Sequence, residues 1–187
     1  MARPVRRALS LLRRLTPTAA PDVDVDDDRV AALAADATSD TVTPGVLANR
    51  ENRSNRPIVA YLEGDERPRY VFRGSELIVA DPDGSSTRKH PTRELQVVLT
   101  DRRLLFVVGG RLADDLVELP LSAVRSAYVE DEGRRLYLVV DADREDTPMT
   151  FFADVTLEGN GQDLVTAAEA VDPGDGSTGE STDDPTV

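Results

Sequence analysis

The sequence contains no cysteine and a single histidine, His90. Without cysteine, the chain forms no disulfide and offers neither a thiol nucleophile nor a thiolate metal ligand. No apolar run approaches the roughly 18 residues of a transmembrane helix, so we expect none. The apolar stretch 8–15 is interrupted by one serine and two arginines, which does not fit a secretory signal peptide. These absences favour a cytoplasmic protein.

Lysine is nearly absent as well. Of 22 basic residues only Lys89 is a lysine, and 35 acidic residues give a formal net charge of −13. This composition resembles that of proteins from a halophilic cytoplasm, where a hydrated carboxylate surface stays soluble although salt screens other charges. An ordinary acidic soluble protein is the alternative. The negative charge argues against binding to nucleic acid.

Short apolar runs separated by turn residues fill the middle of the chain, between residues 57 and 157. This pattern predicts the strands of a barrel or sandwich. Turn residues such as Gly109-Gly110 supply the backbone conformations that connect them. A helix is predicted over residues 161–171, with Leu164, Val165, Ala168 and Val171 on one face. The predicted strands are Ile58–Glu63, Tyr70–Phe72, Glu76–Ala80, Leu95–Thr100, Arg103–Val108, Leu116–Leu119, Val124–Glu130, Leu136–Val140 and Thr147–Phe152.

The flanking segments differ in composition from this middle part. Residues 17–56 carry a run of aspartates and little apolar patterning, which predicts an acidic disordered linker with a short helix over Asp28–Ala37. Residues 172–187 consist almost entirely of Gly, Ser, Thr, Pro and acidic residues, which predicts a disordered acidic tail. The folded domain is therefore expected over residues 57–171.

Residues 1–16 form a basic segment whose pattern indicates an amphipathic helix. On a helical wheel its arginines occupy one arc and its apolar residues the other. Such a helix can lie on an anionic membrane with its leucines buried, dock on the folded domain or a partner, or interact with the acidic run 22–28. Near molar salt the Debye length is only about 3 Å, so membrane anchoring would depend on the leucines. The residues predicted for membrane or partner contact are Arg3, Arg6, Arg7, Leu9, Leu12, Arg13, Arg14 and Leu15.

The usual motifs of catalysis and cofactor binding are not matched. His90 has no second histidine or cysteine with which to form a site. The acidic run fails as an EF-hand loop, because counting from Asp22 the sixth and twelfth positions are Asp27 and Leu33. The glycine pairs lack the residues of a phosphate-binding loop. The sequence predicts no catalytic residue, cofactor or metal ligand.

Two groups of arginines could bind a lipid headgroup. Arg67, Arg69 and Arg73 form the first group. The acidic residues Asp65 and Glu66 directly before it offset part of its positive charge. A second pair stands at positions 102 and 103. Neither concentrates positive charge, so we interpret both groups mainly as surface arginines that balance local carboxylates.

Three segments, in matching order and spacing, resemble pleckstrin-homology-like (PH-like, GRAM-like) domains of bacteria and archaea. Val97–Phe106 (VVLTDRRLLF) resembles their "LT(D/N)xRLL" hairpin, Leu119–Ala127 (LPLSAVRSA) their "(I/L)PLxxIxxV" segment, and Leu62–Pro68 (LEGDERP) their "L..GE.P" opening. The resemblance spans residues 58–171. It implies a mostly β, bent-sheet barrel of about seven strands capped by one C-terminal helix, and it implies no conserved reaction.

We therefore expect a non-catalytic PH-like interaction module, peripheral to the inner membrane face through its N-terminal helix. The alternative is a soluble protein-binding or self-associating scaffold domain without membrane contact. An enzyme or a carrier of a small ligand would need a polar pocket that the sequence does not indicate. The expected partner is a protein or a second copy of the chain.

Overall fold

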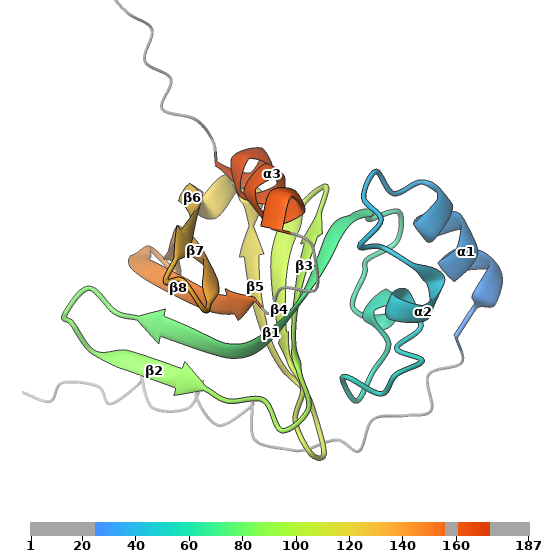
Figure 1. Ribbon diagram of the computed structural model, residues 1–187, viewed down its shortest axis with the longest axis horizontal. Helices are drawn as coiled ribbons and strands as arrows, with labels where there is room; N and C mark the ends of the chain where they lie inside the picture. Colours follow the sequence, from blue (N-terminus) through green and yellow to red (C-terminus); the bar gives the residue numbers. More distant parts are fainter. Residues whose placement is uncertain (1–24, 156–160, 173–187) are drawn as a thin grey trace, which may run out of the picture.

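The computed structural model describes residues 25–155 and 161–172, which form one bent antiparallel sheet with helices packed against it (Figure 1). Seven strands follow the order β5-β4-β3-β1-β8-β7-β6, and an eighth, β2, pairs with β1 outside this path. The prediction of a mostly β, bent sheet capped by one C-terminal helix is confirmed. The strands are β1 (Pro68–Ala80), β2 (Ser86–Lys89), β3 (Leu95–Thr100), β4 (Arg103–Val108), β5 (Asp115–Pro120), β6 (Val124–Asp131), β7 (Leu136–Arg144) and β8 (Thr147–Val155). The helices are α1 (Asp27–Ala35), α2 (Pro44–Leu47) and α3 (Gly161–Val171), with single 3-10 turns at η2 (Ile58–Ala60) and η3 (Leu121–Ala123).

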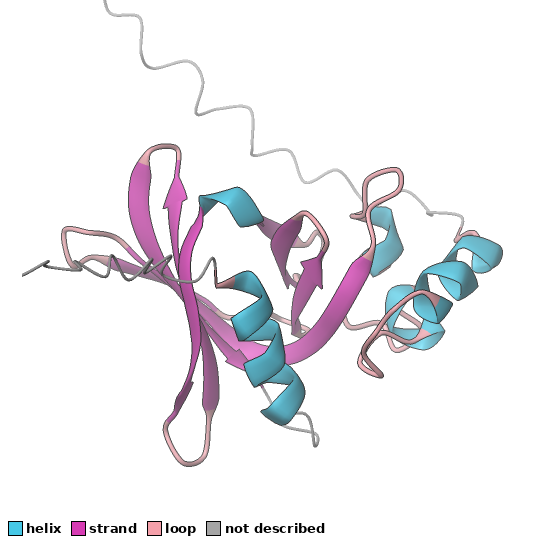
Figure 2. Ribbon diagram, turned by 90° about the horizontal axis from the view of Figure 1, so that it is seen from above, coloured by secondary structure: helices cyan, strands magenta, loops and turns pink. Residues whose placement is uncertain are grey.

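The long strand β1 joins the two halves of the sheet. Its first part pairs with β3 and its last part with β8, and the change of partner falls at Gly74, which pairs with both Leu95 and Val155. A Cβ at Gly74 would lie 2.2 Å from the carbonyl oxygen of Asp154, so only glycine allows this close crossing. The register shifts directly after Gly74. This irregularity lets one strand bend from one half of the sheet into the other, as Figure 2 shows from above.

The concave side of the sheet holds the larger of two buried clusters, here called the inner cluster. Every strand except β2 contributes to it, and the stacked rings of Phe106 and Phe151, with centroids 5.9 Å apart, lie in it. The helix α3 contributes Leu164, Ala167 and Ala168. The predicted bounds of α3 are confirmed, but its predicted face included Val165, which is exposed because it lies about 100° around the helix from Leu164.

Residues 25–62 cover the convex side of β1, β3 and β4 and form a second buried cluster, the outer cluster. Strands contribute Val71, Val98 and Leu105, and the covering segment contributes Val30 and Leu47 together with other apolar residues. The structure thus differs from the expected disordered linker over 17–56, since residues 25–56 pack on the sheet. Burial on an apolar sheet face offsets the polar composition of this segment.

Local capping supports the same segment. The side chain of Asp26 accepts hydrogen bonds from the backbone nitrogens of Asp28 and Arg29, both at 3.1 Å, at the start of α1. Thr43 caps α2 in the same manner through Val46 N, with Pro44 at the first helical position. Asp26, one residue of the acidic run, is therefore the N-cap of α1.

Three strand predictions need correction. Residues 58–63 contain the 3-10 turn η2 and no strand, because Ile58 and Val59 are apolar for packing into the outer cluster. The two strands expected over 70–72 and 76–80 are one continuous strand, β1. The strand β2 was not predicted, since its sequence, Ser-Thr-Arg-Lys, is polar and mostly exposed.

The segments predicted as a basic helix (1–16) and an acidic tail, apart from Asp172, lie outside the described residues. Within residues 25–155 and 161–172, no helix has the length and apolar character needed to cross a membrane.

Candidate functional site

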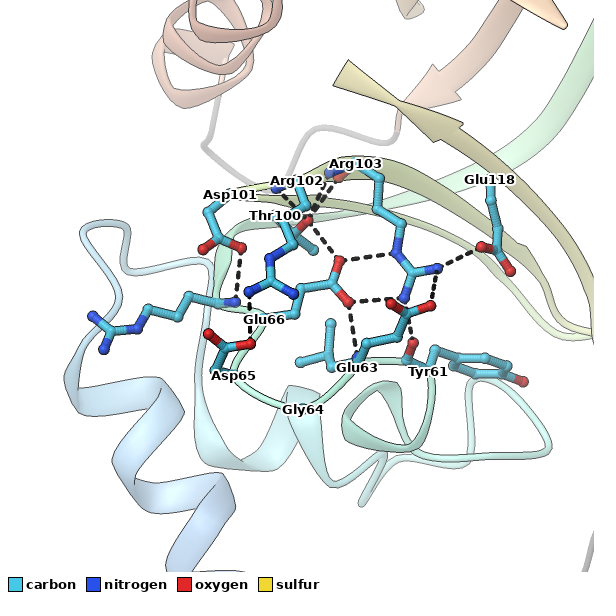
Figure 3. A network of polar contacts seen from close by, with 12 residues as sticks. Tyr61, Glu63, Gly64, Asp65, Glu66, Thr100, Asp101, Arg102, Arg103 and Glu118 are labelled. Carbon is cyan, nitrogen blue, oxygen red and sulfur yellow. Dashed lines mark hydrogen bonds and ion pairs between the residues drawn. The ribbon is translucent and has the colours of Figure 1, made fainter. Parts of the chain in front are cut away.

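A buried ion pair lies where the hairpin of β3 and β4 meets the loop before β1 (Figure 3). The Glu66 side chain is fully buried and accepts hydrogen bonds from Arg103 Nε at 2.9 Å and Arg103 Nη2 at 2.8 Å. It also accepts from Thr100 Oγ1 at 2.8 Å and from the backbone nitrogen of Glu63 at 2.9 Å. Both carboxylate oxygens are thus saturated with donors, as a buried charge requires.

Opposing effects act on this carboxylate. Burial raises the pKa of Glu66, but the hydrogen bonds from Arg103, Glu63 and Thr100 outweigh it, so the pKa lies below its ordinary value. The hydrogen bond to Glu66 raises the pKa of Arg103 above its ordinary range. Arg103 also donates to the carbonyl oxygen of Tyr61 at 2.9 Å and contacts Glu118. Both groups are therefore stabilised in their charged forms, and the pair holds the loop 61–67 on the sheet.

A second polar network fixes the segment before η2. Asp114 accepts hydrogen bonds from the backbone nitrogens of Asn55 and Arg56, at 2.8 and 3.0 Å, and from the Tyr61 hydroxyl at 2.5 Å. Burial, followed by the hydrogen bond to Asp114, raises the pKa of Tyr61 above its ordinary range. The guanidinium of Arg56 lies 5.3 Å from the centre of the Tyr61 ring. This network ties the covering segment to the connection between β4 and β5.

An open hollow of about 580 Å³ lies beside the first network. It is formed where the end of α1, the start of β1, the β3–β4 turn and the end of α3 come together. Exposed side chains of both charge signs surround it, together with the half-buried ring of Tyr70. The charged residues in its lining are Asp36, Asp65, Arg67, Arg69 and Asp101.

Several charges around this hollow are only partly engaged. Arg67 Nη1 lies 3.7 Å from Asp36 Oδ2, while the backbone nitrogen of Arg67 donates to Asp101 Oδ1 at 3.0 Å. Asp65 accepts from Arg102 Nη2 at 2.6 Å, and this bond holds the pKa of Asp65 below its ordinary value. Exposed ion pairs of this kind contribute little to stability and exchange readily for other partners. The hollow is therefore lined by exposed charges of both signs.

The structure separates the arginines that the sequence grouped together. Arg67 and Arg69 line the hollow, whereas Arg73 pairs with Glu94 through contacts of 2.6 and 3.0 Å. Arg102 lies at the surface, and Arg103 is nearly buried in the network described above. Four of these five side chains pair with carboxylates, but Arg103 is nearly buried and therefore does not fit the prediction of a surface arginine.

The remaining sequence candidates fall elsewhere. His90 is exposed, and its Nε2 lies 3.2 Å from Glu76 Oε1. Gly109-Gly110 connects β4 to β5. Among the described residues, no group of three or more His, Cys, Asp or Glu side chains is arranged to hold a metal ion. The predicted contact residues at positions 3, 6, 7, 9, 12, 13, 14 and 15 all lie outside the described part of the chain.

Sequence reasoning missed Glu66, Asp114 and the covering segment. Glu66 falls in the segment Leu62–Pro68 that resembles a family motif, but nothing in the local sequence distinguishes Asp114 from the many surface acids. The donors to both carboxylates come from distant positions, so the sequence did not indicate either pairing. The sequence did contain a signal that another segment covers the sheet. The runs LQVVLT and RLLFVV are apolar apart from two polar residues in the first and one in the second, which is typical of strands buried on both faces.

The chain was also compared with solved structures. A Vps36 N-terminal PH domain aligns over 64% of this chain and 89% of its own length, with a TM-score of 0.40 and 12% sequence identity. No family model matches the chain, and no curated protein does. Membership of the bacterial and archaeal PH-like family therefore stays a prediction from the sequence motifs.

Proposed function

We propose that this protein is a non-catalytic interaction module that residues 1–16 bring to an anionic membrane surface. The observation that supports it best is that one ion pair near the hollow is buried, whereas the charges that line the hollow are exposed. The buried pair of Glu66 and Arg103 stabilises the fold. The charged side chains of Arg67, Arg69 and Asp36 are exposed to solvent, where another molecule could contact them. Exposed, loosely paired charges suit reversible recognition of a protein segment.

The membrane contact is supported by the pattern of the N-terminal segment. Its leucines and arginines occupy opposite arcs of a helical wheel, with Leu12 near the centre of the apolar arc and Ser10 at the centre of the basic arc. A helix of this length binds membranes reversibly, through burial of its apolar face and attraction to anionic lipids.

Flotation with anionic vesicles in high-salt buffer tests this part. We expect the full chain and Ser10→Asp to float, while Leu12→Asp and a chain that begins at Pro17 stay in solution. Ser10→Asp is the matched control, because it adds the same charge to the same segment on its basic face. Equal flotation of Leu12→Asp and the wild type would overturn the membrane proposal.

A soluble scaffold without membrane contact is the second candidate, and one feature favours it. Ile78, Phe152, Val139 and Tyr128 pair in this order across β1, β8, β7 and β6, and together they form the apolar row. None of the four belongs to the inner or outer cluster; Tyr128 is 48% exposed, Ile78 and Phe152 are half-buried, and Val139 is buried. A partly exposed apolar row on a sheet face suits contact with a protein.

Self-association through this row is measurable by sedimentation over a range of protein concentrations. We expect a mass that rises with concentration for the wild type and a constant monomer mass for Tyr128→Glu. Val165→Glu is the control, because it places the same charge at an exposed apolar position on α3. If Val165→Glu abolishes association as well, the apolar row is not the interface.

A further inference from the structure

The connection between β4 and β5, residues 109–114, carries Leu112, whose side chain is 70% exposed. Among the described residues, the other exposed large apolar side chains are Tyr128 at 48% and Val165 at 37%. Leu112 belongs to neither the inner nor the outer cluster. The connection projects from the sheet at the end away from α3 (Figure 1). Single exposed apolar residues are common, so the surroundings of Leu112 decide whether it has a role.

The connection has a fixed shape. The backbone nitrogen of Gly110 donates to Asp114 Oδ1 at 3.3 Å, and the carbonyl oxygen of Gly110 accepts from Asn55 Nδ2 at 2.8 Å. A Cβ at Gly110 would collide with the carbonyl oxygen of Ala113, so only glycine allows this close turn. An ordered turn thus presents Leu112, and a contact made through it costs little conformational entropy.

Two arginines beside Leu112 have no carboxylate partner. Arg111 is exposed and forms no ion pair with any residue in the described ranges 25–155 and 161–172. Arg93 is exposed as well; its backbone nitrogen donates to the carbonyl oxygen of Gly109 at 3.0 Å, and its side chain donates to a backbone carbonyl at 2.8 Å. The nearby carboxylates of Glu94 and Asp115 are paired with other basic side chains. In a chain of formal net charge −13, an anionic surface repels this end less than the rest.

The described chain also begins at this end. Asp27, at the start of α1, lies 3.5 Å from Arg50 Nη2. Five residues later, the side chain of Asn55 is bonded to the β4–β5 connection. The eight residues 17–24 that follow the predicted basic helix span at most about 29 Å. A membrane-bound helix over residues 1–16 would therefore hold this end of the fold near the membrane surface.

We propose that the β4–β5 connection is a second membrane contact. Leu112 enters the boundary between lipid headgroups and acyl chains, while Arg111 and Arg93 face anionic headgroups. Residues 1–16 are still needed, because one leucine and two arginines do not hold a protein on a bilayer alone, so this contact rests on the proposed membrane function.

The contact fixes the orientation of the fold on the membrane. The hollow lies beside the start of β4, at Arg103, whereas the connection follows the end of β4, at Val108. These two positions are about 17 Å apart along the strand. When the connection touches the membrane, the hollow and α3 therefore remain accessible to a protein partner.

A lipid titration of the full chain tests the contact, with vesicles of equimolar phosphatidylcholine and phosphatidylserine. We expect Leu112→Asp to weaken partition onto the vesicles by about tenfold, because the burial of one leucine is lost. Val165→Asp is the matched control and should bind like the wild type, because it adds the same charge at an exposed apolar position on α3. Equal partition of the two variants would overturn this contact and leave the membrane function of residues 1–16 intact. A wild-type chain that does not bind would overturn both.

A fluorescent label gives a second reading, because the natural sequence has no cysteine. An environment-sensitive fluorophore on Leu112→Cys should shift its emission to the blue when the vesicles are added, and a lipid-borne quencher should reduce its intensity. The same label on Val165→Cys should change in neither respect. An unchanged label at position 112 on a vesicle-bound chain would overturn the membrane contact and direct the search for a partner of Leu112 to an acidic protein.

Discussion

The two halves of the sheet have similar strands but different outer faces. In the covered half (the first part of β1 with β3, β4 and β5), all six residues of β3 are buried, because residues 25–62 pack on its outside. In the open half (the last part of β1 with β8, β7 and β6), β6 alternates between buried and exposed positions at Val124, Arg125, Ala127 and Tyr128. A strand covered on both faces reads as a continuous apolar run, and a strand covered on one face reads as an alternation.

The largest expected effect on stability comes from a substitution in the covered half of the sheet. Leu105 faces outward from β4 and is 0% exposed under the cover. We expect Leu105→Ala to lower the free energy of unfolding by about 4 kcal/mol, through lost burial and the cavity left behind. Tyr128→Ala on the open half should cost under about 1 kcal/mol, because its side chain is half exposed. Urea denaturation of both variants in the same salt checks this, and equal losses would contradict the assignment of the two faces.

The next effect concerns the ion pair that fastens the cover's last loop. Glu66→Gln keeps the shape but removes the buried carboxylate opposite Arg103, so we expect a loss of about 3 kcal/mol. The matched control is Asp65→Asn, one residue away, whose exposed ion pair with Arg102 should contribute far less than the buried pair. Denaturation curves of the two variants compare them, and a larger loss for Asp65→Asn would show that burial does not decide the outcome.

The same carboxylate predicts a pH dependence. The folded pKa of Glu66 lies below its ordinary value of 4.5. Its contribution to stability is therefore complete above about pH 4.5 and is lost as the pH falls through the lower, folded value. Stability of the wild type should fall more steeply than that of Glu66→Gln between about pH 5 and pH 3. Parallel curves would show that Glu66 titrates alike in the folded and unfolded states.

A stabilising change is expected within the covered half. Gln96 is 0% exposed, and neither of its amide atoms has a hydrogen-bond partner among the described residues. Replacing a buried group without partners by an apolar side chain of similar size removes a desolvation penalty, so Gln96→Met should add about 1.5 kcal/mol. Thermal melting measures this gain. A loss of stability would indicate that the side-chain amide of Gln96 forms hydrogen bonds in solution.

The smallest expected effect lies in the open half, at the turn between β7 and β8. Glu145 and Asp146 have φ values of 50° and 63°, which fit the two central residues of a type I′ turn. Glu145→Asn with Asp146→Gly places the preferred residues there and should add about 1 kcal/mol. The same double change at Ser122 and Ala123, outside any such turn, is the control and should give no gain.

Several parts of the fold follow from local patterns. The bounds of β3, β4 and α3 were predicted as observed, because continuous apolar runs and an apolar spacing of three and four residues depend on neighbouring positions alone. The candidate site was harder to predict from the sequence. The arginines at positions 67 and 69 were recognised, but the pairing of Glu66 with Arg103 joins residues 37 positions apart.

The sequence by itself determined the positions of β3 and β4, the capping helix and the acidic character, since these depend on periodicity and composition. Only the tertiary structure decided that residues 25–62 form a cover, that residues 58–60 turn instead of forming a strand, and that β1 continues through Gly74. The physical reason is the same in each case. A weakly apolar segment becomes ordered when another part of the chain offers it an apolar face, and that face exists only once the sheet has formed.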